Sequence, residues 1–206
     1  VGTYSASLPS AAGTATRSAW VDRADDQTSW LMLIRPAALR ILGVLAIATA
    51  VHFSVVWAVP RVMMWKLLDS LGQAPGGANG TPAPFLPPLA NANARRVVMP
   101  NPDLLYGLCA LDLEQGAMIV RVDPKLSTYW SIALYSSNSD NFFVLNDREA
   151  GQLPVELRIS TTPDQPKAIV APSKKVLLLM RVLVPDRTQG MDALEAARSS
   201  LRCSTS

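Results

Sequence analysis

An uninterrupted apolar run from Ile41 to Val59 constrains this chain more than any other feature of its sequence. No residue in the run carries a full charge at neutral pH, and at 1.5 Å per residue a helix of this length crosses a hydrocarbon core of about 30 Å. Trp57 and Trp65 lie near its far end, where aromatic side chains gather at membrane surfaces. A buried core helix usually keeps one polar face, and this run has none. The run therefore predicts a transmembrane anchor over residues 30–60.

The residues before the anchor have a different composition. Residues 1–29 are rich in Ser, Ala and Thr and show no apolar period, which predicts a disordered tail. Met32 opens a short basic segment that leads into the apolar run, as at the start of an export signal. We therefore expect Val1–Leu31 to be an upstream extension. The small residues Ala48-Thr49-Ala50 offer a cleavage site, but the apolar run exceeds a usual signal-peptide core, which favours an uncleaved signal anchor.

The distribution of Arg and Lys around the span sets its expected orientation. Arg23, Arg35 and Arg40 precede the span, and Arg61 and Lys66 follow it. Because positive charge is retained on the cytoplasmic side, we expect a cytoplasmic N-terminus and an exported C-terminal part. Membrane lipid is then the immediate partner of the chain.

Two further segments separate the span from the C-terminal part. Residues 61–72 carry apolar side chains at Val62, Met63, Trp65, Leu67, Leu68 and Leu71. They predict a short amphipathic helix that ends at Gly72 and lies on the membrane surface or against the following domain. Residues 73–94 are dense in Pro, Gly, Ala and Asn, which predicts a linker.

Residues 95–206 alternate turn signals with β-type runs, and they predict an antiparallel β-sandwich or jelly-roll-like domain of about seven strands. The expected strands cover residues 104–111, 117–122, 129–135, 142–145, 155–159, 167–170 and 176–184. The last of these is almost entirely apolar, so we expect it at the centre of a sheet. A C-terminal helix over Asp192–Leu201, with Asp192 as a capping residue, completes the predicted mainly β domain.

Cysteine and histidine are scarce. Cys109 and Cys203 both fall in the predicted exported domain, and an even number in an oxidising compartment favours a disulfide. Two free thiols, with Cys109 buried in a strand, are the alternative. His52, the only histidine, lies within the span; an ionisable group there is a functional candidate, but no acidic residue shares the span, which favours a neutral imidazole. These three residues do not supply a tetrahedral metal site, so we expect neither metal nor cofactor.

Basic residues are too scattered for a nucleic-acid partner. The formal net charge is +3 over 206 residues, and the only adjacent basic pairs are Arg95-Arg96 and Lys174-Lys175. A nucleic-acid surface requires a larger cluster or stripe of positive charge.

Polar and aromatic side chains concentrate between Val97 and Asp147. Tyrosine rings with nearby carboxylate and amide groups suit a small ligand or a glycan. The candidate binding residues are Asn101, Asp103, Tyr106, Tyr129, Ser131, Tyr135, Asn138, Asp140 and Asn141. The alternative is turn chemistry with core aromatics, because Asn and Asp beside Pro102 fix turns through bonds to their own backbone.

Catalysis has weaker support in the sequence. Asp103 and Asp140 could form a carboxylate pair for glycoside hydrolysis, but spacing in sequence does not establish their separation. Ser131 has no histidine outside the membrane to act as its base, and no Gly-x-Ser-x-Gly turn surrounds it. We therefore predict no catalytic residue.

The segments Pro100–Tyr106 and Tyr129–Asn141 resemble a bacterial family, the domain-of-unknown-function 1254 family. Its members typically show Pro-Asn-x-Asp-Thr-Leu-Tyr, a strand ending in Asp-Leu-x-x-Gly-Pro, and a Tyr-x-Ser strand. Here Leu104 replaces the threonine and Ala117 replaces the final proline. The resemblance implies a β-rich domain without an established reaction, and a companion membrane protein that carries the domain numbered 1214.

Anchor, linker and domain together predict a single-pass protein in the inner membrane of a Gram-negative bacterium, with its C-terminal domain in the periplasm. The leading hypothesis is a module for ligand binding or complex assembly. One alternative is an envelope enzyme that acts on carbohydrate or lipid through Asp103 or Asp140. Another is a structural subunit of a membrane complex.

Overall fold

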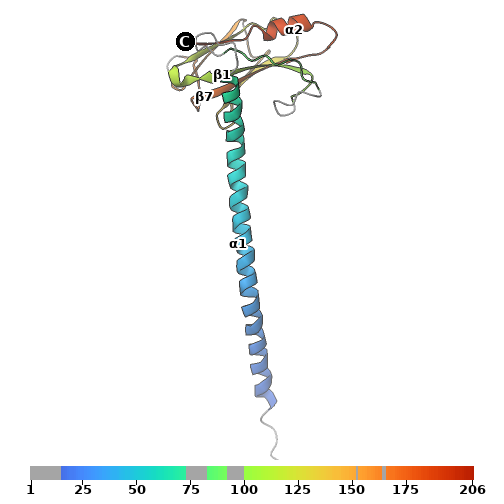
Figure 1. The fold of residues 1–206 in the computed structure, drawn as a ribbon, viewed down its shortest axis with the longest axis vertical. Coiled ribbons are helices and arrows are strands. Elements are labelled where there is room, and N and C mark those ends of the chain that lie inside the picture. The colour runs from blue at the N-terminus through green and yellow to red at the C-terminus, as the bar shows by residue number, and fades with distance from the viewer. Residues whose placement is uncertain (1–14, 73–82, 92–99, 152, 164–165) are drawn as a thin grey trace, which may run out of the picture. The chain divides into compact units, whose positions relative to one another are not determined.

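The computed structural model describes residues 15–72, 83–91, 100–151, 153–163 and 166–206. By their internal contacts the residues divide into two units, Val1–Val56 and Trp57–Ser206, which are described separately. The first unit contributes most of helix α1 (Ala15–Gly72), and the second contains the last turns of that helix and all of the strands (Figure 1).

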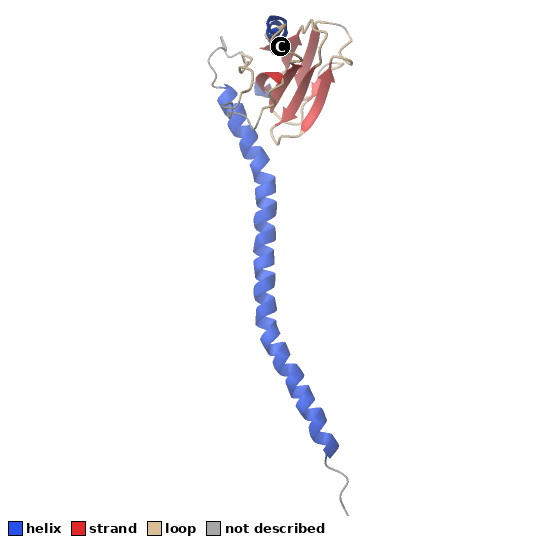
Figure 2. Ribbon diagram, turned by 90° about the vertical axis from the view of Figure 1, so that its right-hand side faces the viewer, coloured by secondary structure: helices blue, strands red, loops and turns tan. Residues whose placement is uncertain are grey.

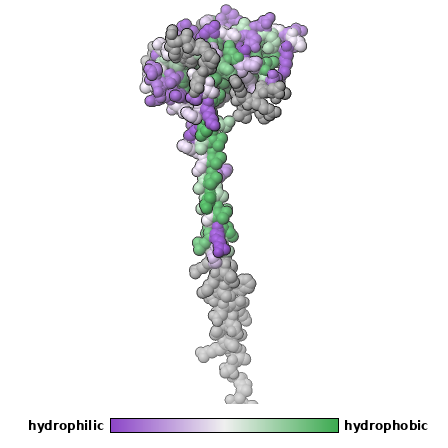
Figure 3. Space-filling model, in the orientation of Figure 1, coloured by the Kyte–Doolittle hydropathy of each residue, from purple (hydrophilic) through white to green (hydrophobic). Residues whose placement is uncertain are grey.

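Helix α1 contains a stretch, Pro36–Gly72, that by length and composition could cross a membrane. Its large apolar side chains are exposed; Ile47 is 68% exposed and Phe53 is 67% exposed. In Figure 3 they form an apolar surface along the helix. The structure therefore confirms the prediction of a helix that is long and apolar enough to span a membrane.

The limits of α1 differ from the predicted ones at both ends of the span. The helix begins at Ala15, so residues 15–29 are helical rather than a disordered tail, while residues 1–14 lie outside the described part. A helix that has already formed over the apolar run can extend into these residues without an apolar period, because elongation is much more favourable than nucleation. At the other end, residues 61–72 continue the same helix through Pro60 and stop at the expected Gly72.

Eight strands form two four-stranded sheets (Figure 2). The first sheet is antiparallel throughout, in the order β1 (Leu104–Asp112), β7 (Lys175–Leu183), β3 (Trp130–Ser136) and β4 (Asn141–Asn146). The second sheet has the order β6 (Ile169–Val170), β5 (Val155–Ser160), β2 (Met118–Val122) and β8 (Arg202–Thr205), with β5 and β6 parallel. A 3₁₀ turn, η2 (Leu113–Gln115), joins β1 to β2, and helix α2 spans Met191–Arg198.

One hydrophobic core receives side chains from both sheets. The fully buried contributors include Leu105, Leu111, Met118, Val120, Ile132, Ile159, Leu178 and Met180. Strand β7 lies between β1 and β3, as its apolar sequence predicts, because a strand with neighbours on both edges is shielded from water. The mainly β architecture with one long N-terminal helix and one C-terminal helix is confirmed.

All seven predicted strands are present, and β8 is an additional one. Its sequence, Arg202-Cys-Ser-Thr205, lacks apolar alternation, and only its pairing with β2 makes it a strand. The prediction for the closing helix was wrong at both ends. Its N-cap is Gly190, which adopts a left-handed φ of 72°, and Asp192 lies within the first turn. The helix ends at Arg198, because Leu201 turns into the core just before β8.

The second half of the predicted linker packs on the domain. Phe85 and Leu108 exchange two backbone hydrogen bonds of 2.7 and 2.9 Å, which covers the free edge of β1. Arg198 donates to the carbonyl oxygen of Pro87, and Ala90 is 6% exposed. Proline here limits regular strand pairing but does not prevent burial. Residues 73–82 and 92–94 of the predicted linker lie outside the described part.

Candidate functional site

The outer face of the first sheet, opposite the core, carries the last turns of α1. Met64 and Leu68 of the helix are each 7% exposed and pack with Leu108 and Leu177 of the sheet. Further contacts come from Leu67, Leu71, Phe85, Tyr106, Ala110, Tyr135 and Leu179. The helix residues follow a spacing of three and four, which places one apolar stripe against the sheet. We call residues 60–71 the docked helix end.

Polar contacts fix the start of the docked helix end. Ser139, in the β3–β4 loop, donates its hydroxyl hydrogen to the carbonyl oxygen of Pro60 at 3.0 Å. Arg61 donates to the carbonyl oxygen of Trp57 at 2.6 Å, and its guanidinium lies 4.3 Å from the centroid of the Trp57 ring. The Ser139 hydrogen bond thus joins the domain to the residue directly after the apolar run that ends at Val59.

The predicted binding residues near the start of β1 form a turn. Asn101 accepts a hydrogen bond from the backbone N–H of Asp103 through its side-chain oxygen at 2.9 Å. The backbone N–H of Asn101 donates to the Tyr106 hydroxyl at 3.0 Å, and Leu104 N–H donates to the Asn101 carbonyl at 3.3 Å. This is the Asx-type turn chemistry that Asn and Asp favour.

Asp103 is exposed and paired with a cation. An Arg187 Nη atom lies 3.2 Å from Asp103 Oδ1 and 2.7 Å from the Pro102 carbonyl oxygen. An ion pair this exposed contributes at most about 1 kcal/mol. Beside it, hydrogen bonds from the Thr188 hydroxyl and backbone N–H hold the pKa of Asp186 below its ordinary value. These contacts are typical of a solvent-exposed loop.

The other predicted binding residues lie in the β3–β4 loop. Asn138 accepts from the Ser136 hydroxyl and donates to Asp140 Oδ2 at 2.5 Å. Asn141 donates to the carbonyl oxygens of Leu134 and Phe143 at 3.3 and 3.4 Å, where the pairing of the two strands shifts register. Their polar groups are therefore used within the hairpin.

The structure divides the nine predicted residues between opposite ends of the first sheet. Asp103 bonds to Val184 just past one end of β7, and Asp140 bonds to Ser136, which pairs with Val176 near the other end. At 3.3 Å per residue these points are about 25 Å apart. Glycosidase carboxylates lie within about 9.5 Å of each other. The two aspartates cannot act as one carboxylate pair, and the residues do not line one cleft.

Tyr129 and Tyr135 illustrate the division. Tyr129 is 41% exposed in the loop before β3, whereas Tyr135 is half-buried against the docked helix end. His52 lies on the exposed surface of α1, where its ring and that of Phe53 form a T-shaped pair with centroids 5.8 Å apart. Within the described residues, no cluster of three or more metal-ligating side chains is present.

A polar row crosses the outer face beside the docked helix end. Tyr106, Arg181, Ser131 and Asn146 occupy matching positions on β1, β7, β3 and β4. Ser131 is fully buried, and neither its hydroxyl nor the buried Nε of Arg181 has a hydrogen-bond partner. Sequence reasoning missed Arg181, since a single arginine in an apolar strand gives no signal of its cross-strand neighbours. Guanidinium and hydroxyl together could bind a carboxylate or a carbonyl group.

Replacing Ser131 with alanine tests whether this row is unpartnered in the working protein. A buried hydroxyl without a partner costs about 1–3 kcal/mol, so Ser131→Ala is expected to raise the free energy of unfolding by about 1 kcal/mol. Urea unfolding of the purified chain measures the difference. A loss of stability on substitution would instead reveal a bound water or ligand that the serine satisfies.

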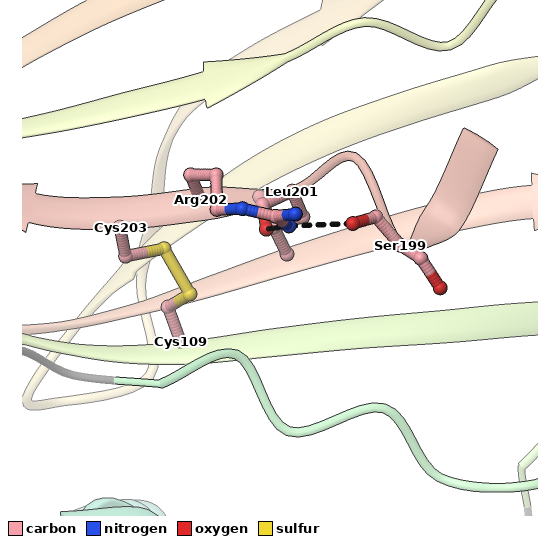
Figure 4. Close-up of a disulfide and its surroundings, with 5 residues drawn as sticks. All are labelled: Cys109, Ser199, Leu201, Arg202 and Cys203. Atoms are coloured by element: carbon pink, nitrogen blue, oxygen red, sulfur yellow. Dashed lines mark hydrogen bonds between the residues drawn. A yellow bond between two sulfur atoms is a disulfide. The ribbon is translucent and has the colours of Figure 1, made fainter. Parts of the chain in front are cut away.

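A disulfide joins the two sheets. Cys109 of β1 and Cys203 of β8 are bonded, with their Cα atoms 6.7 Å apart and both side chains buried. Figure 4 shows the bond beside Arg202, whose guanidinium donates to the carbonyl oxygens of Ser199 and Leu201. The bond fixes the strand that sequence reasoning missed against the first strand of the other sheet.

The sequence matches the family described as "Protein of unknown function (DUF1254)" over residues 84–205. The chain belongs to the DUF1254 family. No curated protein matches the sequence. Among solved structures, the VPA0106 protein of Vibrio parahaemolyticus is similar, with 16% identity, a TM-score of 0.45, and coverage of 51% of this chain and 28% of that one. An uncharacterised protein from Burkholderia cenocepacia shows 16% identity, a TM-score of 0.44, and coverage of 69% and 45%. This chain thus spans less than half of either structure.

The DUF1254 match begins at residue 84, one position before the Phe85–Leu108 bridge. The family domain therefore includes part of the segment predicted to be a linker. Leu104, which replaces the threonine of the typical motif, opens β1, and Ala117 follows Gly116, whose φ is 131°. Neither departure removes a strand of the domain.

Proposed function

We propose that this DUF1254 protein is a single-pass protein of a Gram-negative inner membrane that holds a β-sandwich domain at the periplasmic surface for binding or complex assembly. The observation that carries the proposal is the docked helix end. Met64 and Leu68 are buried against the sheet, and the contact of Pro60 with Ser139 directly follows the apolar run. A domain attached in this way is held close to the membrane surface rather than on a flexible tether.

The disulfide supports an exported domain. Disulfides persist in the periplasm and are rare in the reducing cytoplasm. The buried Cys109–Cys203 bond therefore agrees with a domain in the periplasm and, for a single span, with a cytoplasmic N-terminus. The cation–π contact of Arg61 with Trp57 would lie near the bilayer surface in this arrangement, where aromatic and basic side chains are favoured.

An assembly role is favoured over catalysis by the positions of the polar residues. The two aspartates considered for an enzyme lie at opposite ends of a sheet, and the amides beside them are occupied in turns. A companion of the 1214 type, or another copy of the chain, would then be the partner. An envelope enzyme that uses Asp103 or Asp140 singly remains the second candidate function, because both carboxylates are exposed.

Native mass spectrometry of the full chain, extracted gently from its own membrane, tests this proposal. We expect a complex of defined mass that survives Asp103→Asn and Asp140→Asn. Loss of a bound small molecule in these variants would favour the enzyme or ligand site. Detection of the chain only as a monomer, with neither a partner protein nor a second copy, would contradict an assembly role.

An exchange of the anchor distinguishes the proposed function from the alternative of a structural subunit of a membrane complex. Residues 36–59 are replaced by an unrelated transmembrane helix, while the docked helix end and the domain are kept. We expect the complex to persist, since the hydrogen bond at Pro60 and the buried contacts of Met64 and Leu68 are all kept. Disappearance of the complex would show that the helix within the membrane makes the essential contacts.

A further inference from the structure

The centre of the polar row holds two buried hydrogen-bond donors that the described residues leave unpartnered. Ser131 is fully buried and its hydroxyl has no partner, and the buried Nε of Arg181 has none either. The two residues are directly opposite in register on β3 and β7, so their Cβ atoms lie about 4.5–5.5 Å apart. Buried polar groups almost always have a partner. Two adjacent exceptions point to one shared acceptor that the described residues do not supply.

The two ends of the row also present donors. The hydroxyl oxygen of Tyr106 accepts from the backbone N–H of Asn101 at 3.0 Å, which leaves the hydroxyl hydrogen available for donation. The side-chain oxygen of Asn146 accepts from the backbone N–H groups of Arg148 and Glu149 at 3.0 and 3.1 Å, which leaves its amide hydrogens available. The acceptors at the ends of the row are therefore in use, while every member retains a donor.

The guanidinium of Arg181 has no carboxylate to balance it on this face. Among the outward-facing residues of the four strands, only Asp112 carries a carboxylate, and it lies opposite Lys175, six residues or about 20 Å from Arg181 along β7. Asp147 and Glu149, which follow β4, are exposed. None of the ion pairs among the described residues includes Arg181. A row of donors with one uncompensated positive charge fits an anionic ligand.

We propose that the polar row binds the carboxylate group of a small ligand, with Arg181 and Ser131 as its main contacts. The Nε and one Nη of a guanidinium donate in parallel to the two oxygens of a carboxylate, which is the strongest geometry for such a pair. The Ser131 hydroxyl, opposite in register, donates to the oxygen on its own side. Tyr106, Arg181 and Asn146 are each partly exposed, so the ligand approaches from solvent and Ser131 forms the floor of the site.

The single charge of the row favours a carboxylate over a phosphate. Arg181 is its only charged member, whereas a phosphate monoester carries about −1.5 to −2 charge at pH 7. The second negative charge would lie beside the buried Ser131 without a cation, and burial of an unpaired charge is costly. A neutral carbonyl group would leave the guanidinium uncompensated. The inference goes beyond the proposed function, because it assigns the domain a ligand of its own.

Urea unfolding of the full chain in detergent at pH 7, with acetate as the probe, tests the site. Binding to the folded state lowers the equilibrium constant of unfolding by a factor of one plus the ratio of ligand concentration to dissociation constant. We expect a saturable fall, of about tenfold when acetate is at ten times its dissociation constant, relative to chloride at equal ionic strength. Acetamide, which lacks the charge, and inorganic phosphate should each change the constant by less than about twofold.

Two substitutions locate the acetate effect at the row. Ser131→Ala removes the buried hydroxyl, and Arg181→Lys keeps the charge but removes the fork; each should weaken acetate binding about tenfold. Ser131→Ala should still stabilise the chain in chloride, where its hydroxyl has no partner. Ser136→Ala is the matched control, because Ser136 is 2% exposed on the same strand but bonded to Asn138. It should lower stability equally in acetate and chloride. Arg121→Lys, on the other sheet, is the control for the arginine.

Nuclear magnetic resonance of arginine side chains labelled with ¹⁵N gives a readout that does not depend on stability. Acetate should shift the Nε–H signal of Arg181 in the native chain, because a new acceptor bonds to that hydrogen. The signal is assigned by its loss in Arg181→Lys. Its shift should saturate at the same acetate concentration as the unfolding effect.

Three results would overturn the site. They are the lack of a saturable response to acetate, an equal response to acetate, acetamide and phosphate, and a full acetate response in both Ser131→Ala and Arg181→Lys. A shift confined to arginine signals that persist in Arg181→Lys would overturn it as well. Failure of the site leaves the proposed function intact, since native mass spectrometry tests the assembly role separately.

Discussion

Removal of the Cys109–Cys203 bond is expected to lower the free energy of unfolding of the domain by about 4–5 kcal/mol. The two cysteines are 94 residues apart in sequence, so the bond removes a large amount of conformational freedom from the unfolded chain. It also holds β8, a four-residue edge strand with little apolar sequence, against the rest of the fold. The variant with Cys109→Ala and Cys203→Ala should therefore unfold at a much lower urea concentration than the native chain.

Urea unfolding of the full chain in detergent, followed by tryptophan fluorescence, measures this effect through the buried Trp130. The native chain with and without reductant is the internal comparison, and the double alanine variant with reductant is the control for effects of reductant alone. An unchanged unfolding midpoint on reduction would contradict the contribution assigned to the bond. Cys109→Ala alone should match the double variant, because either substitution removes the bond.

Met64→Ala is expected to have the second largest effect. Met64 is 7% exposed where the docked helix end meets Leu108 and Leu177, and its truncation leaves a cavity between helix and sheet. Such losses cost about 2–5 kcal/mol in well-packed cores. The neighbouring Met63 is 51% exposed, and Met63→Ala should change the free energy of unfolding by no more than about 0.5 kcal/mol.

Comparison of Met64→Ala with Met63→Ala separates the contribution of docking from that of helix propensity, because both variants make the same replacement at adjacent positions. The measurement is the urea midpoint, together with hydrogen exchange of the amides in residues 60–71. Equal effects of the two substitutions would contradict a docked helix end. Faster exchange confined to residues 60–71 in Met64→Ala would show that the helix detaches before the sheets unfold.

Local pattern was sufficient to predict most of the fold. The seven predicted strands follow alternation or apolar runs, which report burial on one or both faces of a sheet. Strand β8 was not predicted, because Arg202–Thr205 has no such pattern and its pairing with β2 is a long-range contact. The bridge between Phe85 and Leu108 was not predicted either, because Phe85 lies in a proline-rich segment and its partner is distant in sequence. Helix α2 begins one residue before the expected Asp192, because a left-handed glycine forms its cap, and it ends three residues before the expected Leu201.

The candidate site was much less predictable. Nine polar and aromatic residues close in sequence were expected in one cleft, but strands β1 and β3 carry them to opposite ends of β7. Proximity in sequence does not indicate proximity across a sheet, because the register decides which residues meet. The row of Tyr106, Arg181, Ser131 and Asn146 arises only from that register. The turn interpretation of Asn101 and Asp103 agrees with their hydrogen bonds.

Labelling of Val170→Cys in intact spheroplasts tests most directly whether the domain lies at the periplasmic surface. Val170 is exposed on the domain, whereas Cys109 and Cys203 are bonded and buried, so a membrane-impermeant maleimide should react at the new cysteine alone. We expect full labelling before the membrane is opened, and none in the native chain. Labelling of Val170→Cys only after the membrane is disrupted would place the domain in the cytoplasm and contradict the proposal.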